Sequence, residues 1–155
     1  SSSSRIAVTL SGNTLVVSDT DGYTCQILIL ERNGAGVWIQ QVDVGSFIKQ
    51  ACPENIWLSG LSLNGDTLAV GGGIYGKYTY VFARDAVGLW TLEANLTHVD
   101  TVNTDWVGFT VSLHGDVLAI SVEGDDDKGL NAGAVYMYTR ANKTWTKSAN
   151  LTHVD

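Results

Sequence analysis

The sequence predicts an all-β fold made of three consecutive four-stranded antiparallel sheets. Three observations support it: a stretch of roughly 50 residues recurs three times, glycine-containing turns separate short apolar runs, and no window shows a convincing helical period. With 17 glycines and one proline, the composition suits short strands joined by tight turns. With 45% hydrophobic and 16% charged residues, the 155-residue chain is long enough for one domain with a sizeable core.

Each copy of the repeat begins with two apolar runs that flank a glycine. Gly12, Gly65 and Gly115 each stand next to Asn or Asp, where a tight hairpin needs the positive φ that glycine adopts at little steric cost. We therefore expect these runs to be the first and second strands of each sheet. The runs after the turns are Leu15–Val17, Leu68–Val70 and Leu118–Ile120.

A third apolar run in each copy ends in arginine and leads through a short polar loop to a tryptophan, where the fourth strand begins. The third runs are Ile27–Arg32, Tyr80–Arg84 and Tyr136–Arg140, and the tryptophans are Trp38, Trp90 and Trp145. Four strands in roughly 50 residues are the size of one β-propeller blade. We expect three blades, over residues 5–46, 57–100 and 107–155, with the recurring tryptophans packed between neighbouring blades.

The third copy carries the residues D-x-x-G-F-T-V-S-L-H-G-D-V-L-A-I, followed by G-D-D-D-K-G-L-N-A-G-A-V-Y. It resembles the FG-GAP repeats of integrin-α-like β-propellers, in a degenerate, short-turn variant. The resemblance weakens toward the N-terminus, where the Phe-Gly pair aligns with Val107-Gly108, Trp57-Leu58 and Ser4-Arg5 in copies three, two and one. It implies a propeller in an extracellular or cell-surface protein, and it leaves adhesion, lectin-like binding and scaffolding open as functions.

The resemblance does not bring the family's calcium site with it. In integrin-type repeats an Asp-rich calcium loop joins the two inner strands, and here turns of two or three residues replace it. Calcium takes six to eight oxygen ligands, which such a turn cannot supply. We therefore expect no cofactor, with one weaker alternative. Asp125, Asp126 and Asp127, between the second and third strands, form either a solvated acidic loop or a calcium site, although their spacing matches no EF-hand.

Trp57 and Trp106 are less regular than the other tryptophans. Each stands just before an inner strand, where the loop faces one mouth of a propeller. They are either core residues or exposed rings that stack on a sugar.

Three Asn-x-Thr sequons stand at Asn95, Asn142 and Asn150. Asn142 falls on a predicted hairpin tip, and Asn95 and Asn150 hold the same position on the outermost strand of two blades. We expect these sites to carry N-glycans in a secretory context. The two cysteines, Cys25 and Cys52, either form one disulfide in an oxidising compartment or remain buried thiols.

The charge and the motifs exclude several classes of function. A formal net charge of -7 would repel a nucleic-acid backbone, and no apolar stretch is long enough for a membrane span. No nucleophile elbow, phosphate-binding loop or metal-binding His pair is present in the sequence, so we expect no enzymatic activity.

Three blades alone would leave two sheet edges exposed, because propellers have about four to eight blades. Further blades of the same chain, a six-bladed ring of two copies, or end-to-end addition of copies would cover these edges. We therefore expect a structural or adhesive extracellular module that associates with itself or with further blades. A propeller that binds carbohydrate or protein is the alternative.

Overall fold

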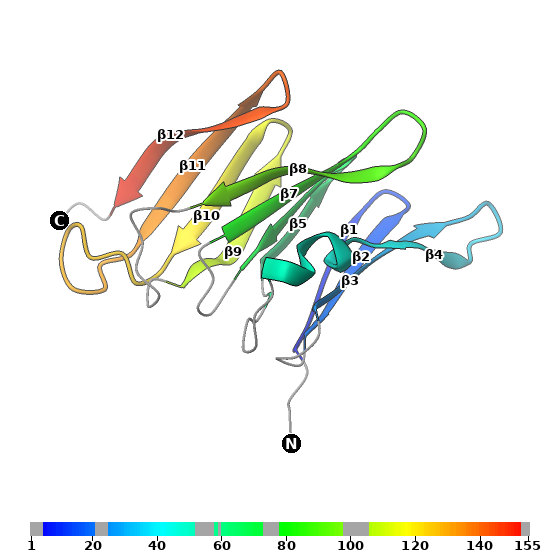
Figure 1. Ribbon diagram of the computed structural model, residues 1–155, viewed down its shortest axis with the longest axis horizontal. Helices are drawn as coiled ribbons and strands as arrows, with labels where there is room; N and C mark the ends of the chain where they lie inside the picture. The colour runs from blue at the N-terminus through cyan, green and yellow to red at the C-terminus, as the bar shows by residue number, and fades with distance from the viewer. Residues whose placement is uncertain are drawn as a thin grey trace.

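The computed structural model describes residues 5–20, 25–51, 58, 60–72, 78–97 and 106–152. These residues form three four-stranded antiparallel sheets, each built from strands consecutive in sequence. The predicted all-β fold of three consecutive four-stranded blades is therefore confirmed. The blades fan out as in a propeller, and they do not close into a ring (Figure 1).

The strands of each blade follow the order of the chain. The first blade contains β1 (Arg5–Ser11), β2 (Thr14–Thr20), β3 (Cys25–Arg32) and β4 (Trp38–Asp43). The second contains β5 (Gly60–Asn64), β6 (Thr67–Gly71), β7 (Tyr78–Arg84) and β8 (Trp90–Thr97). The third contains β9 (Val107–His114), β10 (Val117–Val122), β11 (Ala134–Ala141) and β12 (Thr144–Thr152).

The first two strands of every blade are joined by a two-residue turn with glycine in its first position. Gly12, Gly65 and Gly115 have φ angles of 58°, 57° and 56°, so the predicted need for positive φ is confirmed. The β11–β12 turn instead uses Asn142 and Lys143, with φ of 51° and 62°, as a type I′ turn requires at both of its central residues. These turns fix the pairing register, and with it the face on which each side chain lies.

The second blade lies between the other two, with β5 in contact with β1 on one side and with β9 on the other (Figure 1). We call the side of a blade that packs on the preceding blade its leading face, and the side that packs on the following blade its trailing face. In the second blade the leading face comprises Leu63, Leu68, Val70, Tyr80, Phe82 and Trp90, and the trailing face comprises Ala69, Thr79, Val81, Ala94 and Leu96.

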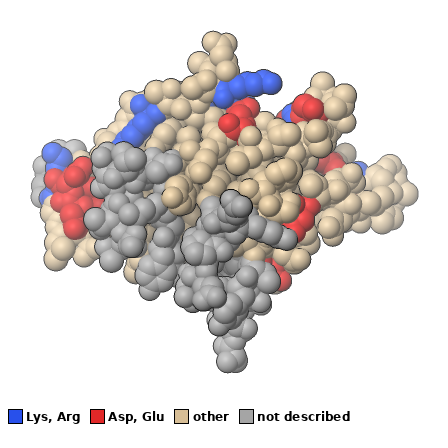
Figure 2. Space-filling view, in the orientation of Figure 1, with Lys and Arg blue, Asp and Glu red and all other residues tan. Residues whose placement is uncertain are grey.

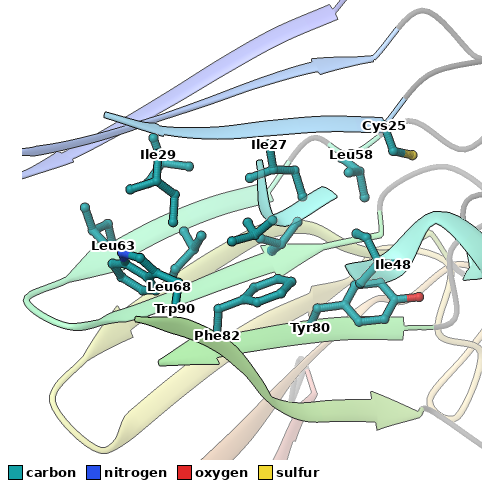
Figure 3. Packing of buried hydrophobic residues seen from close by; sticks show 13 residues of the cluster. Cys25, Ile27, Ile29, Ile48, Leu58, Leu63, Leu68, Tyr80, Phe82 and Trp90 are labelled. Atoms are coloured by element: carbon teal, nitrogen blue, oxygen red, sulfur yellow. The ribbon is translucent and has the colours of Figure 1, made fainter. Parts of the chain in front are cut away.

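The junction between the first and second blades is filled by large apolar side chains. Ile27 and Ile29 on β3 point toward Leu63, Leu68 and Phe82 of the second blade (Figure 3). All of these residues are buried. Complete burial of one such side chain stabilises the fold by about 1.5–3 kcal/mol.

A 3-10 helix, η1 (Val44–Ala51), follows β4, although no window of the sequence shows a convincing helical period. Val44 and Ile48 are buried in the cluster between the first two blades. The Asp43 carboxylate anchors the start of the helix, because its Oδ1 accepts hydrogen bonds from the N–H groups of Gly45 at 2.9 Å and Ile27 at 3.1 Å. The helix therefore forms where an apolar site between two blades holds it, which local periodicity does not reveal.

Candidate functional site

Among the described residues, the same hydrogen bonds between polar side chains and backbone N–H groups occur at both junctions between blades. The Thr9 hydroxyl accepts from the Leu63 N–H at 3.2 Å, and the Ser62 hydroxyl accepts from the Leu113 N–H at 2.9 Å. At the hairpin glycine that follows, Ser11 accepts from the Gly65 N–H at 3.1 Å. Asn64 does the same for Gly115 at 2.9 Å. The first strands of the first two blades, β1 and β5, thus each cap two backbone N–H groups on the first hairpin of the next blade.

In the second and third blades, an arginine at the end of the third strand binds a glutamate of the preceding blade. Arg84 forms an ion pair with Glu31 of the first blade and donates to the turn carboxylate of Asp66 through Nε at 2.7 Å. Its guanidinium also lies 5.5 Å from the centre of the Trp90 ring, within cation–π range. Arg84 and Glu31 each keep about a quarter of their side-chain surface exposed.

The corresponding cluster between the second and third blades is more deeply buried. Arg140 contacts Glu93 of the second blade at 3.1 Å and Asp116 at 2.6 Å, and the Trp145 indole N–H donates to Glu93 at 2.9 Å. Only 9% of the Glu93 side chain is exposed. Burial alone would lower the pKa of Arg140, but its hydrogen bonds to Asp116 and Glu93 outweigh that effect and raise the pKa above the ordinary value.

Glycines let the backbones of the second and third blades approach closely. A Cβ atom on Gly71 would lie 1.9 Å from the Gly108 carbonyl oxygen, and one on Gly60 would lie 2.5 Å from the same oxygen. Gly108 itself has φ of 77°. Gly108 is the glycine that aligns with the Phe-Gly pair of the FG-GAP repeat, so in this chain it serves a close approach between blades.

The leading face of the first blade is uncovered. Ile6, Val8 and Leu10 on β1 are 67%, 64% and 60% exposed, and Trp38 is also exposed. The residues at the position of Leu10 in the other blades, Leu63 and Leu113, are 7% and 6% exposed because a preceding blade covers them.

The trailing face of the third blade is also uncovered. Val117, Val135 and Leu151 are exposed there. Their counterparts on the trailing face of the second blade are Thr67, Thr79 and Leu96, and Thr67 and Leu96 are buried, as is Thr79. The first and third blades thus each present one uncovered side of a junction that the chain completes twice internally.

The predicted packing of the regular tryptophans between blades is confirmed for two of them. Trp90 and Trp145 are buried against the preceding blade, whereas Trp38 has no preceding blade to cover it. Trp106 is 44% exposed, so its interpretation as a core residue is wrong. Trp57 lies outside the described residues.

The acidic loop uses its carboxylates within itself. Asp125 is buried, and it accepts hydrogen bonds from the Tyr136 hydroxyl at 2.9 Å and from the Asp127 N–H at 3.1 Å. Asp126 accepts from the Asn131 N–H at 2.6 Å. Within the described part of the chain, no group of three or more His, Cys, Asp or Glu residues is arranged to hold a metal ion. The calcium hypothesis stays a prediction.

Sequence reasoning missed a cleft between the second and third blades. It has a volume of about 540 Å³ and is lined by both signs of charge, from Arg84, Arg140 and Lys143 and from Asp66, Asp85 and Glu93. The arginine that recurs before each polar loop was the available signal, but its partners lie on another blade and could not be identified without the packing.

The three sequon asparagines, Asn95, Asn142 and Asn150, have exposed side chains, as glycan attachment requires. Cys25 is buried and disulfide-bonded. Cys52 lies outside the described residues, so the Cys25–Cys52 pairing stays a prediction, as does glycosylation.

Charged side chains do not form a single large patch on the face shown in Figure 2. Most of the described surface on that face is neither acidic nor basic, and an acidic group at its left edge lies over the β10–β11 loop. Among the described residues, no helix is long and apolar enough to cross a membrane.

Comparison with protein families supports the resemblance drawn from the sequence. Residues 90–138 match the family model of the FG-GAP repeat. No curated protein matches the chain. The matched stretch runs from the first residue of β8 through β9 and β10 into β11, and it contains Glu93 and Gly108 of the junction between the second and third blades.

The match confirms the resemblance to FG-GAP-like repeats over the stretch that it covers. With the three four-stranded blades, it indicates an integrin-like β-propeller module. FG-GAP repeats typically occur in extracellular or surface proteins.

Proposed function

We propose that this chain is a non-enzymatic structural or adhesive β-propeller module that works outside the cell as part of a larger assembly. The observation that carries the proposal is the pair of uncovered blade faces, the leading face of the first blade and the trailing face of the third. Exposed apolar patches of this kind mark sites of association between proteins.

The buried charged groups support a structural role. Glu93 and Arg140 bind each other across two blades, and Asp125 holds the Tyr136 hydroxyl. Charged groups engaged in this way stabilise packing, whereas a catalytic acid or base has to reach a substrate. The FG-GAP match and the exposed sequons support the extracellular location.

Surface labelling of intact cells from the source organism tests the location. An impermeant biotin reagent should label the protein, and glycosidase treatment of native material should lower its mass. Asn95→Gln, Asn142→Gln and Asn150→Gln variants assign the sites. Protein found only inside the cell, with an unchanged mass, contradicts the proposal.

The alternative function is binding of carbohydrate, and one observation favours it. Trp106 is exposed just before β9, and the first residue of that strand, Val107, pairs with Val122, beside which the acidic loop begins. An exposed indole ring can stack on the apolar face of a sugar. A glycan array probed with wild-type protein and Trp106→Ala tests this function. Binding that the substitution abolishes supports it, and an array without signal excludes it for the glycans present.

A further inference from the structure

The two junctions inside the chain define what would cover its open faces. In both junctions, two Ser, Thr or Asn side chains on the first strand of one blade each accept a hydrogen bond from one backbone N–H group on the first hairpin of the next blade. In both, the leading face of the later blade is aliphatic and aromatic. The same arrangement therefore identifies the partner of an uncovered face.

The first blade presents the receiving half of this arrangement. Leu10 pairs with Leu15 across the β1–β2 hairpin, as Leu63 pairs with Leu68 and Leu113 with Leu118. Because the hairpins share one register, the N–H groups of Leu10 and Gly12 point away from β2 at the open edge of the sheet, like those that Thr9, Ser62, Ser11 and Asn64 cap.

The third blade presents the capping half. Ser112 and His114 on β9 hold the positions of Ser62 and Asn64 on β5, and both side chains are exposed. A serine hydroxyl and a neutral imidazole nitrogen can each accept a hydrogen bond from an N–H group.

We propose that two copies of this chain associate through these faces, with the third blade of each copy packed on the first blade of the other. Ile6, Val8 and Leu10 of one copy lie against Val117 and Val135 of its partner. Ser112 and His114 accept from the N–H groups of Leu10 and Gly12. Two such junctions, related by a two-fold axis, give a ring of six blades, within the range of about four to eight that propellers adopt.

This junction between copies lacks one element of the internal junctions. Glu31 and Glu93 bind the arginine of the following blade, and the corresponding positions in the third blade hold Thr139 and Ser148. Arg32 and Trp38 of the facing copy therefore meet no carboxylate at either position. The association between copies is weaker than the packing inside the chain, and a Ser148→Glu substitution strengthens it.

Sedimentation equilibrium of the purified chain over a range of concentrations tests the pairing. Wild type is expected to be a dimer in reversible equilibrium with monomer. Val8→Asp and Val135→Asp each place a carboxylate in the apolar junction and shift the dissociation constant at least about 100-fold toward monomer. Val87→Asp is the matched control, because Val87 is 88% exposed at the β7–β8 turn, and it leaves the dissociation constant unchanged.

The Ser148→Glu variant tests the register of the junction. It is expected to lower the dissociation constant about tenfold for each of the two junctions, through a charge-assisted pair with Arg32, and Arg32→Ala should cancel the gain. A monomeric wild type, a dimer insensitive to Val8→Asp and Val135→Asp, or an open polymer overturns the proposal.

The inference rests on the proposed function, since it names the partner in the assembly, but the two fail separately. A monomeric chain found glycosylated at the cell surface overturns only the pairing. An intracellular dimer overturns only the extracellular role.

Discussion

The two junctions inside the chain share one hydrogen-bond pattern but differ in how the space between the blades is occupied. Between the second and third blades, Gly71 and Gly108 bring the backbones together, and the trailing face is small, with Ala69 and Val81. Between the first and second blades, Ile29 and the η1 residue Ile48 occupy the space. We call the junction between the second and third blades the tight junction, and the one between the first and second blades the filled junction. The family match includes Gly108, on the third-blade side of the close contact, and it does not reach Gly71 or the first blade.

The largest expected effect comes from a Cβ atom in the tight junction. Gly71→Ala would place this atom 1.9 Å from the Gly108 carbonyl oxygen, and the backbone has to move. We expect a loss of about 4 kcal/mol in the free energy of unfolding, measured in urea, or failure to fold. Gly115→Ala is the control, because it meets only the φ of 56° with nothing within 4 Å, and it costs about 1 kcal/mol. Equal losses in the two variants would show that the backbone approach is unimportant.

The filled junction should respond to the removal of side-chain volume. Ile48→Ala leaves a cavity between η1 and the second blade and is expected to cost about 3 kcal/mol. Val37→Ala, at a position that is 56% exposed, changes stability by less than about 0.5 kcal/mol. If the Ile48→Ala loss is no larger than that of Val37→Ala, η1 is not part of the core.

The two arginine clusters differ in burial, and their substitutions should differ in the same direction. Arg140→Met leaves the Glu93 carboxylate, 9% exposed, without its charged partner, and should cost about 2–3 kcal/mol. Arg84→Met should cost about 1 kcal/mol, because Glu31 can still be hydrated. Urea unfolding of both variants at low and high salt measures the difference. Equal losses would show that the difference in burial between the two ion pairs does not affect stability.

The tyrosines on the two covered leading faces form another matched pair. Tyr136 donates to the buried Asp125 carboxylate, so Tyr136→Phe should cost about 1–2 kcal/mol. The Tyr80 hydroxyl is buried without a hydrogen-bond partner among the described residues, so Tyr80→Phe should be neutral or slightly stabilising. Thermal unfolding of the two variants side by side checks the order, and a larger loss for Tyr80→Phe would contradict it.

The smallest effect appears only at alkaline pH. Burial, with a smaller contribution from the neighbouring Tyr78, raises the pKa of Tyr80 from 10.0 to about 12. The unfolded chain therefore releases this proton at lower pH than the folded one, and the contribution to stability that is complete below pH 10 is lost as the pH rises toward 12. We expect wild type to lose about 1 kcal/mol relative to Tyr80→Phe by pH 11. Parallel pH profiles of the two proteins would contradict this.

The strands and their turns could be predicted because their signals are local. Gly115 between apolar runs indicates a hairpin, and the run that ends at Arg140 indicates a strand, without knowledge of the rest of the fold. The repeat then multiplies each signal by three. The tryptophans were also predictable as packing residues, since one recurs in each copy.

The contacts between blades could not be predicted, because they depend on the relative register of sheets that lie far apart in sequence. Ser62 caps Leu113 only when β5 and β9 are placed against each other. The helix η1 forms because Val44 and Ile48 find an apolar site on another blade. The cleft, with Arg140 and Glu93 from different blades, has the same origin.

The limits of the family match have a consequence for how such units are copied. Residues 90–138 hold the outer strand of one blade and three strands of the next, so the stretch that matches the family model is offset by one strand from the unit that folds as a sheet. Tandem duplication of this stretch places the last strand of each copy beside the first strand of its successor, joined by backbone hydrogen bonds. After a proteolytic cut between two copies, these backbone hydrogen bonds would still join the two fragments within one sheet.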